Sequence, residues 1–315
     1  MIKILVTGCA GFIGSHVCEF LLRNDNIIVL GIDNLNDYYS VSRKMKNLEI
    51  LKEYPNFEFK KEDIVDTKVI SQWKPDKICH LASMAGVRYS IENPKIYIKV
   101  NIEGFIHILE EARMNDIHKI VYASSSSVYG LNELPFSETD VIESPNSPYA
   151  SSKMAMELFA KTYSQLYGMS LVGLRFFTVY GPRGRPDMAP YKFLDAISSG
   201  KKFNKYGDGT SSRDYTYIDD IVSGIISALD IQGINGIYNL GNSNPVSLNK
   251  FIEICEKITG NKAIYDTLPE QLGDIKHTYA DITKAKRELH YEPKTMLEEG
   301  LKFVIKEIRE IKEKY

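Results

Sequence analysis

The feature that most constrains the fold is a glycine-rich turn directly after the first apolar run of the chain. Residues 2–8 read IKILVTG and predict a strand, while residues 12–23 have the pattern of a helix. Gly8, Gly11 and Gly14 stand at this junction, where glycines let the backbone turn tightly and approach a phosphate group at the helix N-terminus. Glycines often only mark turns, so the prediction depends on the strand before them and the helix after them.

Further apolar runs alternate with helical patterns through the first half of the chain. Strands are expected over 27–33, 57–63, 77–83, 119–125 and 170–176, and a helix over 96–113. Continuous apolar runs are typical of strands buried on both faces of a parallel sheet. The sequence therefore predicts an α/β fold with a Rossmann-type, doubly wound parallel sheet. Residues 34–54 show no clear period, and we expect a mobile or extended excursion there.

The pattern changes after residue 177. Loops are expected at GPRGRPD (181–187) and YGDGTSS (206–212), with helices near 188–199, 219–230, 247–259 and 296–314. We therefore divide the chain into a first domain over 1–177 and a smaller C-terminal α/β lobe over 178–315, which binds the substrate. Some segments of the second part are expected to return to the first domain.

Composition excludes several classes of partner. The net charge of −2 gives no general attraction to nucleic acid or to an acidic membrane surface. The four cysteines form no CxxC pair and no metal-ligand spacing, so we expect reduced thiols and no metal. No apolar run approaches the roughly 20 residues of a membrane span. The sequence thus predicts a soluble, cytoplasmic protein.

A carboxylate ends the second expected strand. Asp33 follows the glycine-rich turn by about 20 residues, where an acidic side chain accepts hydrogen bonds from both hydroxyls of an adenosine ribose. The same carboxylate would repel a 2′-phosphate. The pattern therefore indicates a dinucleotide site that prefers NAD to NADP.

Tyr149 and Lys153 stand four positions apart in YASSK, which places them on one face of a helix. Beside a nicotinamide cofactor, Lys153 and the positive ring would both lower the pKa of Tyr149, which could then act as a general base on an alcohol. The stretch ASSSSVYG (123–130) ends another expected strand and places serine hydroxyls at the sheet edge where ligands bind. Taken singly, a surface Tyr–Lys pair or a serine-rich loop remains the alternative.

Together these motifs resemble the extended short-chain dehydrogenase/reductase family over essentially the whole chain. The resemblance rests on TGCAGFIG, Asp33, the DI of residues 63–64, HLAS (80–83), Asn101, the Ser125/Tyr149/Lys153 set and RDYTYIDD (213–220). It implies that Ser125, Tyr149 and Lys153 are catalytic. The NAD-binding residues that it implies are Gly8, Gly11, Phe12, Ile13, Gly14, Asp33, Asn34, Asp63, Ile64, Leu81, Ala82, Ser83, Asn101, Tyr149 and Lys153.

Within that family, the residues after Ser125 distinguish the reactions. Sugar 4,6-dehydratases carry an Asp-Glu pair where this chain has Ser126 and Ser127, and xylose-forming decarboxylases carry a glutamate at the position of Ser127. The resemblance therefore implies a sugar-nucleotide 4-epimerase. In that reaction Tyr149 removes the C4 hydroxyl proton and hydride passes to NAD. The 4-keto sugar then rotates to present its other face, and the hydride and the proton return to it. Because NAD is regenerated in each cycle, it is expected to be tightly held.

The stretch FFTVYGPRGRPDMA (176–189) is similar to that of UDP-glucuronate 4-epimerases, as are AGVRYS (85–90) and QLGD (271–274). Oxidising C4 of glucuronate gives a β-keto acid, which loses CO2 if its carboxylate stands perpendicular to the ketone plane. Arg185 would hold that carboxylate bidentately, helped by hydroxyls of Ser126 and Thr178. A phosphate contact or a loop salt bridge is the alternative for Arg185.

For the rest of the substrate the resemblance is less specific. It assigns Arg213 to the diphosphate, Asp274 to the uridine ribose and residues Asn204 and Tyr206 to the uracil, with Gln271 and Arg88 near the phosphates. UDP-glucose/UDP-galactose or UDP-GlcNAc/UDP-GalNAc remain alternative substrates, and a non-catalytic NAD-binding scaffold is the alternative of another class. Helices near 96–113 and 149–167 match those that pair relatives into homodimers by a four-helix bundle. The alternative is that their apolar residues all pack against the sheet.

Overall fold

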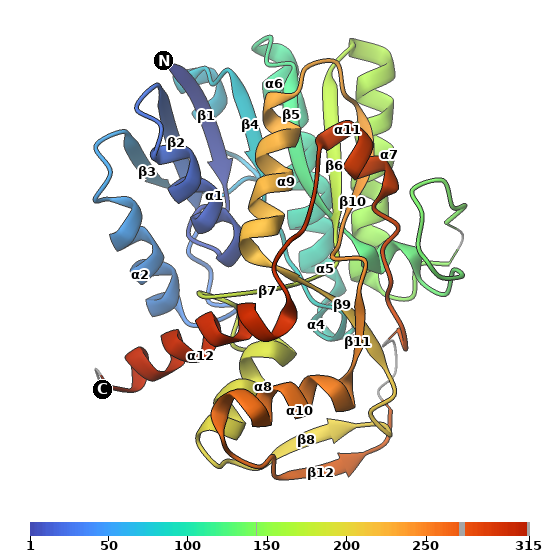
Figure 1. The fold of residues 1–315 in the computed structure, drawn as a ribbon. Coiled ribbons are helices and arrows are strands. Elements are labelled where there is room, and N and C mark those ends of the chain that lie inside the picture. Colours follow the sequence, from blue (N-terminus) through green and yellow to red (C-terminus); the bar gives the residue numbers. More distant parts are fainter. Residues whose placement is uncertain (143, 271–274, 314–315) are drawn as a thin grey trace.

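The computed structural model describes residues 1–142, 144–270 and 275–313. Its centre is a seven-stranded parallel sheet in the order β10-β6-β5-β4-β1-β2-β3. The strands are β1 (Ile2–Thr7), β2 (Ile27–Asp33), β3 (Phe57–Lys61), β4 (Lys77–His80), β5 (Lys119–Ser125), β6 (Ser170–Phe176) and β10 (Gly236–Leu240). This order, with helices on both faces, confirms the predicted Rossmann-type fold (Figure 1).

Alternate side chains of each strand enter two different hydrophobic clusters. Ile4 and Val6 of β1 pack toward α1 (Phe12–Leu22) and α9 (Ile218–Asp230), whereas Leu5 packs toward α6 (Gly104–Met114) and α7 (Pro148–Tyr167). Both faces of the central sheet are therefore shielded from water, which explains the continuous apolar runs of its strands. Among the short helices, α3 (Val69–Trp73) packs against α6, α4 (Val87–Glu92) and α5 (Pro94–Tyr97) pack against α7, and α11 (Thr283–Leu289) packs against α9 and β10. A π-helical turn η1 (Ile98–Glu103) precedes α6, and a 3₁₀ turn η2 (Ser126–Tyr129) follows β5.

The expectation of an irregular excursion over 34–54 is wrong for its second half. Helix α2 spans Val41–Leu51 and buries Lys44, Asn47, Leu48 and Leu51, which follow the i, i+3, i+4, i+7 spacing of one helix face. The apolar period is hidden in the sequence because two of these inward positions are polar. Asn47 Nδ2 donates to Ala10 O at 2.8 Å, so the buried amide ties α2 to the glycine-rich turn.

The lobe lies beyond the carboxyl ends of the strands (Figure 1). It contains α8 (Ala189–Ser198), α10 (Leu248–Thr259) and the two-stranded sheet of β8 (Phe203–Tyr206) and β12 (Tyr265–Leu268). A three-stranded sheet of β7 (Thr178–Tyr180), β9 (Ser212–Tyr217) and β11 (Pro245–Ser247) lies between lobe and central sheet. Because β10 belongs to the central sheet, part of the second half returns to the first; the boundary at residue 177 stays a prediction.

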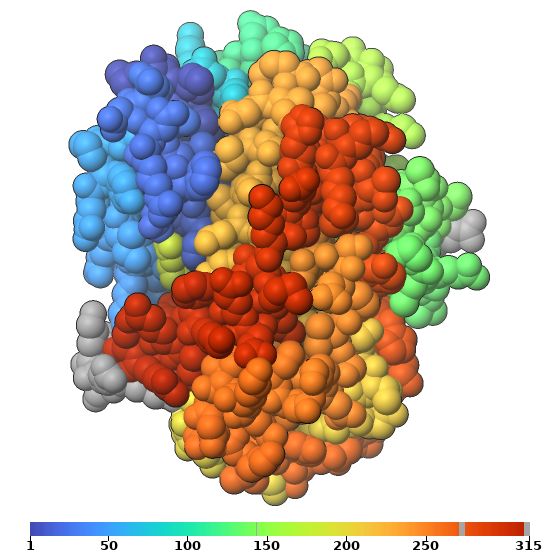
Figure 2. Space-filling model, viewed as in Figure 1, coloured from blue at the N-terminus to red at the C-terminus, as the bar shows by residue number. Residues whose placement is uncertain are grey.

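Helix α12 (Leu297–Glu313) crosses the front of the molecule above α10, as Figure 2 shows in dark red. Its buried residues Leu301, Val304, Ile305 and Ile308 form one face against α8 and α10, while Lys302, Lys306, Arg309 and Glu310 are exposed. Among the described residues, no helix is both long enough and apolar enough to cross a membrane.

Candidate active site

One cavity of about 600 Å³ runs along the carboxyl ends of the central strands and continues into the lobe. It brings together nearly all the predicted site residues that the structure describes. They are Gly8, Gly11, Phe12, Ile13, Gly14, Asp33, Asn34, Asp63, Ile64, Leu81, Ala82, Ser83, Arg88, Ser125, Ser126, Ser127, Tyr149, Lys153, Thr178, Arg185, Asn204, Tyr206 and Arg213. Gln271 and Asp274 lie outside the described residues.

The glycine-rich turn is held by close backbone contacts. Gly8 has a φ of +73°, and a Cβ there would lie 2.8 Å from Ala82 N; a Cβ on Gly14 would lie 2.1 Å from Gly8 O. Gly11 is the N-cap of α1, and no side chain caps this helix. The first turn of α1 (Phe12, Ile13, Gly14) lines the cavity, so its N-terminus can receive a pyrophosphate.

Two carboxylates stand at the carboxyl ends of β2 and β3: Asp33 is the last residue of β2, and Asp63 lies two residues after β3. Asp33 Oδ1 accepts from Leu35 N at 2.8 Å and lies 3.8 Å from Lys44 Nζ, while Asn34 Nδ2 donates to Asp63 Oδ2 at 2.9 Å. Acceptors and donors thus lie side by side in the way that the hydroxyls of an adenosine ribose require, and the residues fit NAD. Sequence analysis missed Lys44 because it lies in the segment that showed no period.

Asn101, among the described residues predicted to bind NAD, does not line the cavity. Its side chain is fully buried in η1 and makes four hydrogen bonds: Oδ1 accepts from Met84 N and Ser83 Oγ, and Nδ2 donates to Met84 O and Ser152 Oγ. The amide is therefore satisfied by protein groups. It fastens the loop after β4, which forms the cavity wall, to α7.

Helix α7 places Tyr149 and Lys153 at the centre of the cavity. Ser147 Oγ accepts from Ala150 N at 3.1 Å, Pro148 occupies the first turn, and Gly168 ends the helix with a φ of 64°. Tyr149 therefore lies in the first turn. Lys153 Nζ lies 6.0 Å from the centre of its ring and donates to Ala123 O of β5 at 2.8 Å.

Burial dominates the protonation of this pair. Desolvation raises the pKa of Tyr149, although the Ser125 hydroxyl and the Arg185 charge oppose it. Desolvation also lowers the pKa of Lys153 to about 7, although the Glu157 charge raises it. Burial thus outweighs the neighbouring charges in the net pKa of Tyr149. The expectation that Lys153 and a nicotinamide ring together lower this pKa concerns the cofactor-bound site and stays a prediction.

Ser125, at the end of β5, donates through Oγ to Ser127 Oγ at 3.2 Å and accepts from Ser127 N at 3.2 Å. The serine run therefore forms a compact turn in which hydroxyl groups of Ser125, Ser126 and Ser127 reach the cavity wall. Ser126 and Ser127 thus place hydroxyl groups at the positions where sugar 4,6-dehydratases carry their Asp-Glu pair.

Arg185 enters the cavity from the loop after β7. Its guanidinium donates to both oxygens of Asp187, at 3.1 Å and 2.5 Å, and to Tyr38 Oη at 3.2 Å. The loop salt bridge considered for Arg185 is thus present. Asp187 therefore holds two of the five N–H donors with which the guanidinium could bind a substrate carboxylate. Further into the lobe, the guanidinium carbon of Arg88 lies 5.4 Å from the Tyr206 ring centre.

Residues 5–304 match the family model described as GDP-mannose 4,6 dehydratase. The chain belongs to this family of extended short-chain dehydrogenase/reductases. Membership confirms the resemblance found from the motifs.

Two relatives in this family cover almost the whole chain. An uncharacterised protein of Methanocaldococcus jannaschii is 51% identical over 95% of this chain and 94% of its own length. A UDP-glucuronate 4-epimerase of Thermodesulfobacterium geofontis is 45% identical over 95% of this chain and 93% of its own.

A crystal structure gives the fold comparison. The UDP-glucuronic acid 4-epimerase of Bacillus cereus, in complex with UDP-glucuronic acid and NAD, superposes with a TM-score of 0.94. It is 37% identical and covers 98% of this chain and 100% of its own. The chain thus resembles nucleotide-sugar epimerases in sequence and in fold.

Proposed function

We propose that this protein is an NAD-dependent 4-epimerase of UDP-sugars and that its substrate is UDP-glucuronate, which it converts to UDP-galacturonate. The observation that carries the proposal is one cavity that joins the open N-terminus of α1 to Tyr149, Ser126, Thr178 and Arg185. The Thermodesulfobacterium geofontis relative and the Bacillus cereus complex support it. A cytoplasmic location stays a prediction.

NAD, when bound along the glycine-rich turn and Asp33, accepts a hydride from C4 and returns it. Tyr149 takes the proton of the C4 hydroxyl and gives it back on the other face of the sugar. Ser125 hydrogen-bonds the same oxygen, and the Lys153 ammonium stabilises the tyrosinate. Because Lys153 is held by Ala123 O at 2.8 Å, its charge stays close to Tyr149 when the proton moves.

The carboxylate of the sugar sets the second requirement. In the 4-keto state, breaking C5–C6 would send its electron pair into the C4 carbonyl and release CO2. Arg185 prevents this by holding the carboxylate near the ketone plane, with hydroxyls of Ser126 and Thr178 on its other lone pairs. All three residues line the cavity beside Tyr149.

Proton NMR of the purified protein tests the proposal. UDP-glucuronate, UDP-galactose and UDP-N-acetylglucosamine are incubated separately without added NAD. A galacturonate anomeric signal in the first tube alone is the expected result and means that NAD is carried by the protein. Conversion only of the neutral sugars would refute the acid specificity. Silence in all tubes, also after adding NAD, would favour a non-catalytic NAD-binding protein.

We further propose that the protein is a homodimer that pairs through α6 and α7 of each copy. These neighbouring helices carry exposed apolar side chains that the central sheet does not cover: Met114 of α6 is 69% exposed, and Leu158 and Leu166 of α7 are 57% and 66% exposed. In η1, directly before α6, Ile98 is 59% exposed. A four-helix bundle would bury them. Exposed apolar side chains gathered on adjacent helices are typical of an interface.

A further inference from the structure

Arg183 stands two positions before Arg185 in the loop between β7 and α8, outside the cavity lining. Its φ is 61°, a left-handed conformation that disfavours residues with a Cβ and persists only where the surroundings fix it. The loop also turns tightly, since Gly184 N donates to Gly181 O at 3.2 Å. A Cβ on Gly181 would lie 2.4 Å from Ile218 Cγ2 of α9, so this segment is pressed against the helix.

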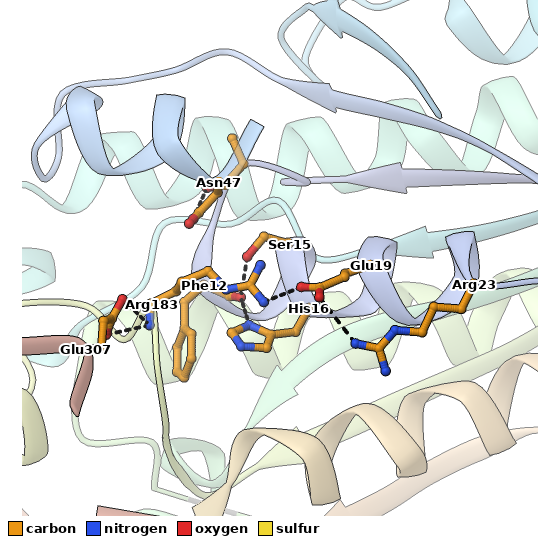
Figure 3. A network of polar contacts seen from close by, with 9 residues as sticks. Phe12, Ser15, His16, Glu19, Arg23, Asn47, Arg183 and Glu307 are labelled. Carbon is orange, nitrogen blue, oxygen red and sulfur yellow. Dashed lines mark hydrogen bonds and ion pairs between the residues drawn. The ribbon is translucent and has the colours of Figure 1, made fainter. Parts of the chain in front are cut away.

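Three helices distant in sequence contact this strained loop, and Figure 3 shows the contacts of two of them, Glu19 of α1 and Glu307 of α12, with Arg183. Both oxygens of Glu307, on α12, accept from Arg183 N at 2.9 Å. The Arg183 guanidinium reaches across to the Glu19 carboxylate on α1. Arg43 Nη1, on α2, donates to Gly184 O at 2.9 Å. Backbone and side chain are thus both tied immediately before Arg185.

The charges around Arg183 favour this arrangement. Its side chain and that of Glu19 are only 16% and 19% exposed, so the ion pair is largely shielded from water. The neighbouring His16 stays neutral because burial and the Arg183 charge lower its pKa to about 3. The Arg183 guanidinium therefore faces the acidic Glu19 and a neutral imidazole.

We infer that Arg183 is a positioning residue that sets the place of Arg185 relative to α1. The inference rests on the proposed function, because it concerns the residue assigned to the substrate carboxylate. Helix α1 starts at the glycine-rich turn, and Glu19 lies about 10 Å along it. The Glu19–Arg183 pair therefore fixes the carboxylate-binding loop to the same rigid helix that receives the cofactor pyrophosphate.

This link matters because the fate of a β-keto acid depends on a small rotation of its carboxylate. An error of about 1 Å in a catalytic group can cost about 100-fold in rate. If Arg185 is free to drift, the C5–C6 bond breaks, its electron pair moves toward the C4 carbonyl, CO2 leaves and C5 takes up a proton. A loosened loop should therefore lower epimerisation and raise the share of decarboxylated product.

The test compares Arg183→Met with a matched control, Arg23→Met. Arg23 pairs with the same Glu19 at 3.2 Å but is 64% exposed and lies away from the loop. For UDP-glucuronate, Arg183→Met is expected to lower kcat/KM by about 10- to 100-fold and to raise the fraction of CO2 released. Arg23→Met should change neither value. Equal behaviour of the two variants would overturn the inference.

A second experiment, made in protein that already carries Arg185→Ala, shows whether Arg183 acts through Arg185. In Arg185→Ala protein, adding Arg183→Met should change kcat/KM by less than about twofold, because coupled residues are non-additive. Full additivity would overturn the inference. Arg183→Gly keeps the left-handed backbone without strain, so it gives a folded variant if Arg183→Met misfolds. Wild-type protein that is inert toward UDP-glucuronate but active on UDP-galactose would instead refute the proposed function.

Discussion

The Arg175 guanidinium donates to both carboxylate oxygens of Glu157, at 2.9 Å and 2.7 Å, between α7 and the central sheet. The side chains are 5% and 9% exposed, and Ser124 Oγ donates to the same carboxylate at 2.5 Å. Glu157 lies one helical turn beyond Lys153. A buried negative charge is therefore held close to the one lysine assigned to catalysis.

Replacing Glu157 by Gln should move the alkaline limb of the pH profile of kcat/KM to lower pH. Burial lowers the pKa of Lys153 to about 7, and the Glu157 charge opposes this effect. Without that charge the pKa of Lys153 falls further, so its ammonium is lost at a lower pH and no longer supports the tyrosinate. The profile is measured between pH 5 and 9 at about one-unit steps.

The same substitution leaves the Arg175 charge buried without its partner, which costs on the order of 3–5 kcal/mol of stability. The double variant Glu157→Gln/Arg175→Met removes that charge and serves as control. If both proteins keep the wild-type alkaline limb, Glu157 does not act on Lys153.

Tyr149→Phe should lower kcat by about 10²–10⁴-fold or more, because the general base is lost while the ring remains. Bound NAD, measured by absorbance after denaturation, should be unchanged. Tyr163→Phe is the matched control, because Tyr163 lies on the same helix but outside the cavity lining. Normal turnover by Tyr149→Phe would refute the assigned proton transfer.

Arg185→Ala should reduce kcat/KM for UDP-glucuronate by at least about 30-fold, the loss expected for about 2 kcal/mol from one partner of a buried charge pair. Any activity on UDP-galactose should stay within a few-fold, since that sugar has no carboxylate. Comparable losses on both substrates would assign Arg185 to the diphosphate.

Asp187→Asn should lower the KM for UDP-glucuronate. Asp187 accepts from two Arg185 donors, at 3.1 Å and 2.5 Å, and so competes with a substrate carboxylate for the same guanidinium. A neutral amide competes less well for a guanidinium. The KM for UDP-galactose gives the comparison. An increase specific to UDP-glucuronate would mean that Asp187 aims Arg185 instead of competing with the substrate.

The double substitution Leu158→Glu/Leu166→Glu should weaken dimerisation by at least about 30-fold, because charges would replace apolar side chains at the proposed centre of the interface. Sedimentation velocity over a concentration series measures this change. Leu131→Glu changes a leucine that is even more exposed, at 79%, in a loop outside these helices and should leave assembly unchanged. A wild-type monomer would contradict the four-helix arrangement.

The sequence allowed the central sheet and most cavity residues to be predicted because their signals are local. An apolar run, three glycines and the Tyr149–Lys153 spacing all lie within short windows. Helix α2 was missed because Lys44 and Asn47 occupy its inward face, where the expected period needs apolar residues. The helix forms there because tertiary contacts give both buried side chains polar partners: Asp33 for Lys44 and Ala10 O for Asn47.

The sequence also did not indicate which residues pair with one another across distant segments. The cofactor contact predicted for Asn101 stays a prediction, but the sequence did not indicate that its buried amide bonds both backbone groups of Met84 in the loop after β4. Likewise, the sequence showed Arg183 and Arg185 as neighbours in one loop without indicating that Glu19 pairs with the first and Asp187 with the second. Pairing across distant segments has no local signature.

The position of β10 has a consequence for synthesis on the ribosome. The strands β1 to β6 are complete by residue 176, yet the edge of β6 is covered only by residues 236–240. During elongation β6 therefore presents unpaired backbone groups while the segments of the lobe are being made. Such an edge can pair with another nascent chain. Until β10 has been synthesised, this protein therefore reaches its native state only if the exposed edge of β6 does not pair with another chain first.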